Sequence, residues 1–451
     1  MWAPRLPLSG RPRWAPALPV LALALAWSGP AAAQPEGGQG EAGQPWRLQS
    51  SSWLGLGDPA AGAQGAGAPM VQWLTLSRSW RDPGLGQATL VMSAWGRLDP
   101  LDLGGAGLGA DLDLFYVEAQ AATQPLRLRV GRQLIVGGAA RLRQIDGLWL
   151  SWRPGVGLGA QLYAGTPTRG RFGTAWGDAV AGGRLAYAFG FEHEVGVSYL
   201  LSAKGGRVSA QDLGLDLHLR PLRPLSLSAR STLALGADDL KEGALRLGWQ
   251  LSPSLRVDAY SELVRPDLFL DQGSIFSVFS DGARVEGGSA LAWRAARGLE
   301  VGGAFSQLLE ASGGRDGLRG RLTLRHTLWR GALRLGLDLD ALGLRAAGAQ
   351  PEEGYAGGRV FGRLRLGERG LLWASAAHYQ LAAPVNGAPS STVLQLGGAW
   401  AVGEGLTLNL TGRYAQTPTY LHQATLMARL DWRFDAASAR APVAVSDEEE
   451  E

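Results

Sequence analysis

The stretch T-L-M-A-R-L-D-W-R-F, residues 425–434, decides the fold. Successive side chains of an extended strand point to opposite faces. Every second residue from Leu426 to Phe434 is apolar, whereas Arg429 and Asp431 belong to the alternate set. A strand of this pattern has one apolar face and one charged face, and it therefore separates an apolar medium from water.

The same alternation recurs along most of the chain. In residues 212–220, 319–328 and 333–340, leucines on one face oppose Arg, Asp or His on the other. A slip of one residue in any of these strands would place charged side chains among the leucines. We therefore predict an all-β protein, a single antiparallel transmembrane β-barrel with apolar residues outward and polar residues inward.

The spacing of turn residues predicts about 22 strands, within a range of about 18–22, over residues 46–434. Tight joints such as Pro154-Gly155 alternate with longer, polar, Gly-rich ones, among them 165–179, 203–206, 265–282 and 383–390. Short periplasmic turns, longer outer loops and two periplasmic termini are expected of such barrels. The two longest loops, 165–179 and 265–282, are the candidates for a constriction.

The two ends of the chain lie outside this pattern. Residues 1–33 read as a secretory signal peptide, with basic residues, an apolar stretch and three alanines at the cleavage point. An uncleaved anchor is the alternative, although prolines interrupt the apolar stretch. Residues 34–45 form a polar linker, and residues 435–451 an acidic tail that is disordered, docks a basic periplasmic partner or occludes the pore from below.

Composition narrows the possible partners. The formal charge of +3 is carried by the three arginines of the predicted leader, so the remainder is near neutral and nucleic-acid binding is not indicated. Cysteine is absent, which excludes thiolate metal sites and thiol nucleophiles. A mean hydropathy of −0.02 agrees with strands that are polar on one face.

Tryptophan supports the same orientation. Five tryptophans lie on apolar strand faces shortly before a tight turn or the end of a strand. They are Trp152, Trp249, Trp293, Trp400 and Trp432. Tryptophan prefers the interface between lipid and water, so we interpret the five as a periplasmic aromatic girdle. The alternative is the aromatic core of a soluble β-protein.

The terminal strand resembles the assembly signal of bacterial outer-membrane barrels, which ends in an aromatic residue, here Phe434. The resemblance implies insertion into outer-membrane lipid by the barrel-assembly machinery. In that family the aromatic residue usually ends the chain, whereas here residues 435–451 follow it.

A second resemblance covers residues 126–134 and 141–152. L-R-L-R-V-G-R-Q-L followed by R-L-R-Q-I-D-G-L-W-L-S-W resembles the GRQ…DG hairpin of alginate-export-like barrels and some porins. It implies a passive channel and assigns Arg132, Gln133 and Asp146 to the hairpin. Strict alternation points Arg132 to lipid. Either a bulge at the preceding glycine turns it inward, or it reaches the outer rim. Pairing with Asp146 and contact with a substrate are both open.

The predicted inner face is rich in arginine. The candidate pore-lining residues are Arg127, Arg129, Arg319, Arg321, Arg325, Arg334, Asp338, Asp340, Arg359, Arg363, Arg365, Arg429 and Arg433. Such a wall can favour anions, and the alternative is that the charges pair across strands and stiffen the barrel.

No pattern of catalytic residues emerges. Ser375 and His378 are close in sequence, but three residues apart on a strand they face opposite sides, so we expect no enzyme. The five histidines have no metal-ligand spacing, and we expect neither metal nor cofactor.

The sequence therefore favours an outer-membrane, porin-like channel for passive diffusion of small or anionic solutes, with export of an acidic polysaccharide as a further cargo. The alternative is a structural or assembly barrel of an envelope machine, with a closed lumen.

Overall fold

The computed structural model describes residues 46–57, 68–82, 86–99, 108–155, 157–169, 173–174, 177–190, 192–269, 282–310, 315–345, 353–418 and 422–435. The predicted leader and linker, and all of the acidic tail except Asp435, lie outside them. The strands are β1 (Arg47–Gly57), β2 (Met70–Asp82), β3 (Gly86–Leu98), β4 (Leu108–Gln120), β5 (Leu126–Val136), β6 (Leu142–Trp152), β7 (Leu158–Arg169), β8 (Gly173–Thr174), β9 (Ala179–Phe189), β10 (His193–Lys204), β11 (Arg207–Leu222), β12 (Leu225–Ala234), β13 (Asp239–Ser252), β14 (Leu255–Val264), β15 (Arg284–Ala296), β16 (Leu299–Glu310), β17 (Arg315–Leu328), β18 (Leu333–Arg345), β19 (Glu353–Leu366), β20 (Gly370–Val385), β21 (Ala388–Gly403), β22 (Leu406–Gln416) and β23 (Gln423–Asp435).

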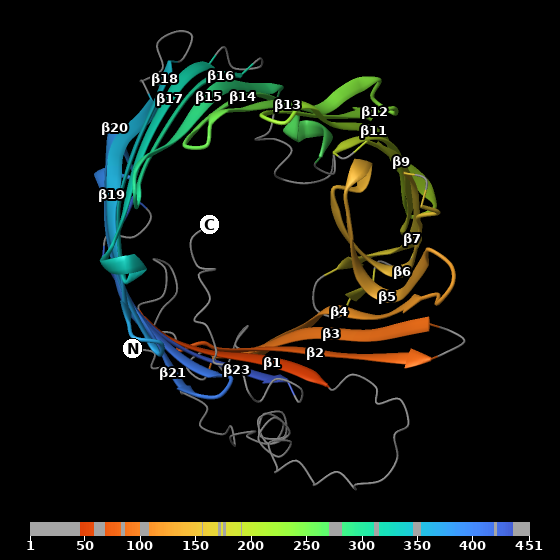
Figure 1. Cartoon of the computed structure of the whole chain (residues 1–451), viewed down its shortest axis with the longest axis horizontal. Coiled ribbons are helices and arrows are strands. Elements are labelled where there is room, and N and C mark those ends of the chain that lie inside the picture. Colours follow the sequence, from red (N-terminus) through yellow and green to blue (C-terminus); the bar gives the residue numbers. More distant parts are fainter. Residues whose placement is uncertain are drawn as a thin grey trace, which may run out of the picture. The chain divides into compact units, whose positions relative to one another are not determined.

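The strands form a closed ring in which consecutive strands pair antiparallel (Figure 1). β8 pairs with β7 alone, and β7 continues the ring by pairing with β9. The first strand meets the last along its whole length, from Arg47 opposite Asp435 to Gly57 opposite Thr425. The prediction of an antiparallel barrel of about 22 strands is confirmed. Closure pairs the strand edges that an open sheet would leave bare.

Short 3₁₀ turns are the only helical elements in the described part of the chain: η1 (Gly138–Ala140), η2 (Pro266–Leu268) and η4 (Trp329–Gly331). Among the described residues, no helix is long and apolar enough to cross a membrane.

Two joints that the sequence predicts to be long are in fact two-residue turns. They consist of Gly205–Gly206, between β10 and β11, and Asn386–Gly387, between β20 and β21. All four residues have φ between 51° and 80°. Positive φ at both central positions matches the right-handed twist of a hairpin, so the glycines mark tight turns here rather than long loops.

The two faces of the wall differ in chemistry, as the alternation predicts. On β17 and β18, Leu322 lies opposite Leu339, and these side chains are 46% and 42% exposed. One residue along the ladder, Arg321 lies opposite Asp340 on the other face. Cross-strand partners keep their side chains on one face, so this division passes from strand to strand around the ring.

One hairpin leaves the wall. β5 pairs with β4 only as far as Arg132, and β6 pairs with β7 only from Ile145 onward. Beyond these residues β5 and β6 pair with each other, out to Val136 and Leu142. The tip of the hairpin lies inside the ring, beside β7 and β9 (Figure 1). The sequence does not predict this inward turn.

The apolar outer face can be tested with one charge. Leu396 on β21 is 66% exposed and lies four residues before Trp400, in the middle part of its strand. Leu396→Arg should destabilise the barrel in a bilayer by about 2–4 kcal/mol, because the guanidinium would enter hydrocarbon. Urea unfolding in lipid vesicles measures the loss. The matched control is Gln395→Arg on the opposite face, and an equal loss in both variants would contradict the assignment.

Candidate functional site

The contacts of the hairpin tip identify which face of the wall is the inner one. The Ala139 N–H donates a hydrogen bond to Ser198 Oγ (2.8 Å), and Arg141 forms an ion pair with Glu242. Ser198 lies opposite Arg184 on β9, and both it and Glu242 belong to the polar face. Because the tip lies within the ring (Figure 1), the polar face is the inner face.

All of the predicted lining residues lie on this inner face, as the register of each strand pair shows. Arg127 and Arg129 are there on β5, Arg319, Arg321 and Arg325 on β17, Arg334, Asp338 and Asp340 on β18, Arg359, Arg363 and Arg365 on β19, and Arg429 and Arg433 on β23. On β17 to β19, seven of these residues are arginine and only two are aspartate, so this part of the inner wall is strongly basic.

The densest cluster on this wall surrounds Asp340. Arg319 and Arg321 donate to its Oδ2 at 3.2 and 2.9 Å, and the Tyr355 hydroxyl donates to its Oδ1 at 2.7 Å. These side chains line a cavity of about 310 Å³ together with Tyr379. The side chains of Arg319 and Arg321 remain 37% and 50% exposed. Since one carboxylate faces two guanidinium groups, the cluster keeps a net positive charge that can attract an anion.

Other arginines on the inner face have partners of their own. Arg359 pairs with Asp338 at 3.2 Å and Arg429 with Asp431 at 2.8 Å. Charge pairing on the wall and a basic surface are therefore both present. The two alternatives from the sequence, an anion-favouring wall and paired charges that stiffen the barrel, are compatible with each other.

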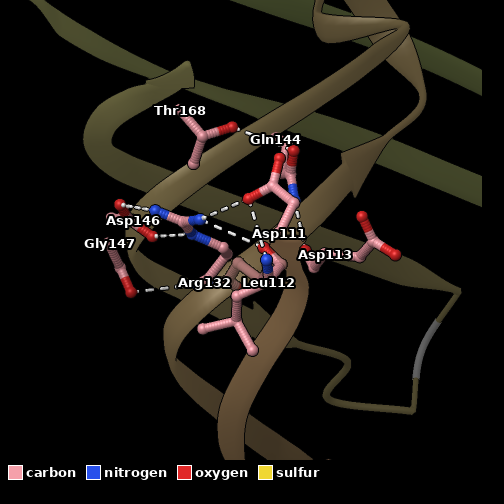
Figure 2. Close-up of polar contacts among 9 residues, drawn as sticks. Asp111, Leu112, Asp113, Arg132, Gln144, Asp146, Gly147 and Thr168 are labelled. Carbon is pink, nitrogen blue, oxygen red and sulfur yellow. Dashed lines mark hydrogen bonds and ion pairs between the residues drawn. The ribbon is translucent and has the colours of Figure 1, made fainter. Parts of the chain in front are cut away.

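The hairpin that resembles the GRQ…DG motif is built around Arg132. This side chain is 8% exposed and donates to both carboxylate oxygens of Asp146, at 2.8 and 2.9 Å (Figure 2). It also donates to the Leu112 carbonyl at 3.0 Å and lies 3.8 Å from Asp111. Arg132 therefore pairs with Asp146 across the hairpin, and it is buried instead of extending to an outer rim.

A glycine produces this arrangement. Gly131 has φ +122°, and a Cβ at this position would lie 2.2 Å from the Phe115 carbonyl oxygen. Only glycine meets both conditions without strain. Arg132 is the last residue of β5 that pairs with β4, so the strand leaves the wall directly after it. Neither strand pairing shifts register at Gly131, and Arg132 is buried because the hairpin leaves the wall directly after it.

Side chains replace the strand pairing that is lost where the hairpin leaves the wall. Gln144 donates to the Asp113 carbonyl of β4 and accepts from Thr168 of β7 at 2.9 Å (Figure 2). Gln133 is fully buried and donates to the Gly147 carbonyl at 3.0 Å. Buried backbone groups without a hydrogen-bond partner are costly, so these polar side chains stabilise the departure of the hairpin.

The tip packs through an apolar cluster on the inner wall. Ile135 and Ile145 are 3% and 0% exposed, and they lie against Tyr163, Val180 and Leu200. This cluster is the main buried core of the described chain. The only local signals for it in the sequence are glycines at the hinge and tip, and these are equally typical of an ordinary loop.

Much of the two loops expected to narrow the lumen, 165–179 and 265–282, lies outside the described residues. The described start of the second loop does reach the hairpin. Phe269 lies beneath the cations of Arg141 and Lys241, at 4.5 and 4.6 Å from its ring centre. The tip of the β5–β6 hairpin lies inside the ring (Figure 1), although the sequence does not predict a constriction there.

The predicted girdle residues lie on the outer face. Trp152, Trp249, Trp293 and Trp400 are between 40% and 51% exposed. Trp432 is half-buried, and its ring centre lies 6.3 Å from that of Phe434. Ser375 and His378 lie on opposite faces of β20, as expected from their spacing.

Comparisons with known proteins support the fold alone. No family model matches the chain, and no curated protein matches its sequence. A chain of the cryo-EM structure of the E. coli P pilus tip assembly intermediate PapC-PapD-PapK-PapG is similar with a TM-score of 0.53 and 10% identity. The match covers 91% of this chain but only 63% of that chain.

Two further barrels are similar at lower scores. The P pilus usher PapC translocation pore has a TM-score of 0.46 at 9% identity, covering 86% of this chain and 99% of that chain. OccAB4 of Acinetobacter baumannii has a TM-score of 0.41 at 9% identity, covering 87% and 98%.

Proposed function

We propose that the protein is an outer-membrane channel through which small solutes diffuse passively, with a preference for anions. The observation that carries this proposal is the basic inner wall of β17 to β19, where Arg319 and Arg321 share the single carboxylate of Asp340. A ring of about 22 strands is wide enough for an aqueous lumen. An acidic polysaccharide is a further cargo compatible with this wall.

The proposal places the barrel in the bacterial outer membrane after removal of residues 1–33. The exposed tryptophans at the ends of β6, β13, β15 and β21 would then lie at the periplasmic interface. Both termini would be periplasmic, with Phe434 acting in assembly of the barrel. The tail beyond it would be a solvated acidic segment in the periplasm.

The inward hairpin supplies the constriction in this proposal. It reduces the open cross-section of the lumen at the side opposite the arginine wall (Figure 1). Arg141 and Glu242 tie the tip to β13. Solutes would therefore pass between a fixed hairpin and a basic wall.

The test is single-channel conductance of the refolded protein in a planar bilayer, with the reversal potential in a salt gradient. We expect discrete open steps and an anion-selective potential. A cation-selective potential would refute the role of the arginine wall. The absence of conductance in a folded, heat-modifiable barrel would refute the open channel.

A double charge reversal sharpens this test. Arg319→Glu with Arg321→Glu changes four unit charges beside Asp340 and should shift the reversal potential to cation selectivity. The control is Arg330→Glu, which changes a charge in the η4 turn between the same two strands. Equal shifts in both variants would mean that the potential responds to overall charge and not to the inner wall.

The alternative is a structural barrel whose lumen is closed, and the hairpin inside the ring is the observation that favours it. The same recording separates the two functions, because a closed lumen gives a folded barrel without conductance.

A further inference from the structure

Besides Trp373 on β20, four tryptophans lie on the inner face of the barrel, opposite to the predicted girdle. On β1, Trp53 lies opposite Arg429, and on β2 and β3, Trp73 and Trp95 lie opposite each other. On β6, Trp149 lies opposite Arg129. A wall in contact with water gains nothing from large aromatic rings unless they pack or bind something.

Two of these rings border a cavity of about 330 Å³, which is also lined by Gln49, Ser51, Thr75 and Arg429. Trp53 and Trp73 meet edge to face, with ring centres 5.6 Å apart and planes at 68°. Trp73 is 38% exposed. Its position leaves part of a large aromatic surface open to the cavity.

A cation already covers the Trp53 ring, whereas the Trp73 ring remains partly exposed. The Arg429 guanidinium lies 4.8 Å from the centre of the Trp53 ring, and its Nε donates to Asp431 at 2.8 Å. Ser51 Oγ also donates to Asp431, at 2.5 Å. The charges of Arg429 and Asp431 beside the cavity are thus paired with each other, so the cavity differs from the basic cluster at Asp340.

Aromatic surface beside amide and hydroxyl groups, with the lining guanidinium of Arg429 paired to Asp431, suits a particular ligand chemistry. A pyranose ring has an apolar C–H face that packs on an aromatic ring, and hydroxyl groups around its edge that bond to amides and hydroxyls. Ligand pockets combine apolar and aromatic walls with a few polar groups in this manner, from about 300 Å³ upward. An ion alone would use neither feature.

We propose that this cavity is a binding subsite for one pyranose ring of a saccharide, stacked on Trp73 and hydrogen-bonded by Gln49, Ser51 or Thr75. The proposal rests on the proposed function in one respect, since a saccharide must reach the lumen. It adds a site that recognises the sugar ring, on the wall of β1 and β2, to a separate wall that recognises charge.

The test uses maltotriose and cellotriose, which present the same ring with two linkages. Either sugar should reduce the single-channel current in a concentration-dependent way, and Trp73→Ala should weaken this block roughly tenfold, the factor set by losing one such contact. Trp373→Ala is the control, because Trp373 lies on the inner face of β20 outside the cavity. Trp73→Phe should keep most of the block.

A second readout separates this proposal from the channel itself. Quenching or a shift of tryptophan fluorescence by maltotriose or cellotriose is measured on the detergent-solubilised barrel, whether or not it conducts. A conducting channel with neither block nor fluorescence change would overturn the subsite and leave the channel standing. A non-conducting barrel that binds sugar through Trp73 would support the subsite and overturn the channel. Block that is equal in Trp73→Ala and Trp373→Ala would overturn the subsite.

Discussion

Replacing Arg132 with methionine should destabilise the barrel by about 3–5 kcal/mol, the usual loss when one partner of a buried charge pair is removed. Arg132 is 8% exposed, and its guanidinium donates to both oxygens of Asp146. Without it, the Asp146 carboxylate loses its partner and the Leu112 carbonyl loses a donor. Methionine fills similar space and keeps the apolar stem of the side chain. The decrease in the free energy of unfolding therefore reports mainly on the lost charge and hydrogen bonds.

The measurement is urea unfolding of the refolded protein in lipid vesicles. The folded fraction is read from the heat-modifiable shift in gel mobility. The matched control is Arg321→Met. Arg321 also pairs with an aspartate, at 2.9 Å, but it is 50% exposed, so its loss should be about 1 kcal/mol or less. Arg132→Met combined with Asp146→Leu should recover part of the stability, because no unpaired charge remains. Equal losses for Arg132→Met and Arg321→Met would contradict a buried role for Arg132.

Removing the tip of the hairpin should roughly double the single-channel conductance or raise it further, because ionic current rises with the open cross-section of a pore. The change replaces residues 135–143 with a two-residue Asn-Gly turn, which joins the register partners Leu134 and Gln144 directly. It keeps Arg132, Gln144 and Asp146, and with them the contacts that close the wall. It deletes the part that packs on Val180 and Leu200.

A milder variant tests the attachment of the tip. Glu242→Gln weakens the pair with Arg141 and should produce transitions between two conductance levels as the tip detaches and returns. The control is an Asn-Gly replacement of Gly205–Gly206, a turn outside the hairpin. Conductance that is unchanged after removal of the tip would show that the hairpin does not limit the current.

Most of the wall could be predicted from sequence, since alternation is visible within each strand. Leu322 and Arg321 alternate in sequence and fall on opposite faces in the barrel. The same alternation distinguishes the girdle tryptophans on the outer face from the tryptophans on the inner face. Trp53 and Trp73 occupy positions of the polar face in the alternation of their strands. Applying the alternation strictly to β1 and β2 would therefore also have placed them on the inner face.

The contents of the lumen could not be predicted in this way. Gly131 and the glycines at the tip are local features shared by many loops. Nothing near them in sequence identifies Val180 or Leu200 as the surface on which the hairpin packs. The cavity beside Trp73 likewise needs Arg429, which comes from the far end of the chain.

The sequence by itself determined the class of fold, the approximate number of strands and the face on which each wall residue lies. It could do so because the two-residue period of a strand is a local property that each segment carries independently. Only the tertiary structure decided that β5 and β6 turn inward after Arg132, and which residues from distant strands meet there and at the Trp73 cavity. These are contacts between segments far apart in the chain, and they depend on ring closure and on the positive φ of Gly131, where β5 leaves the wall.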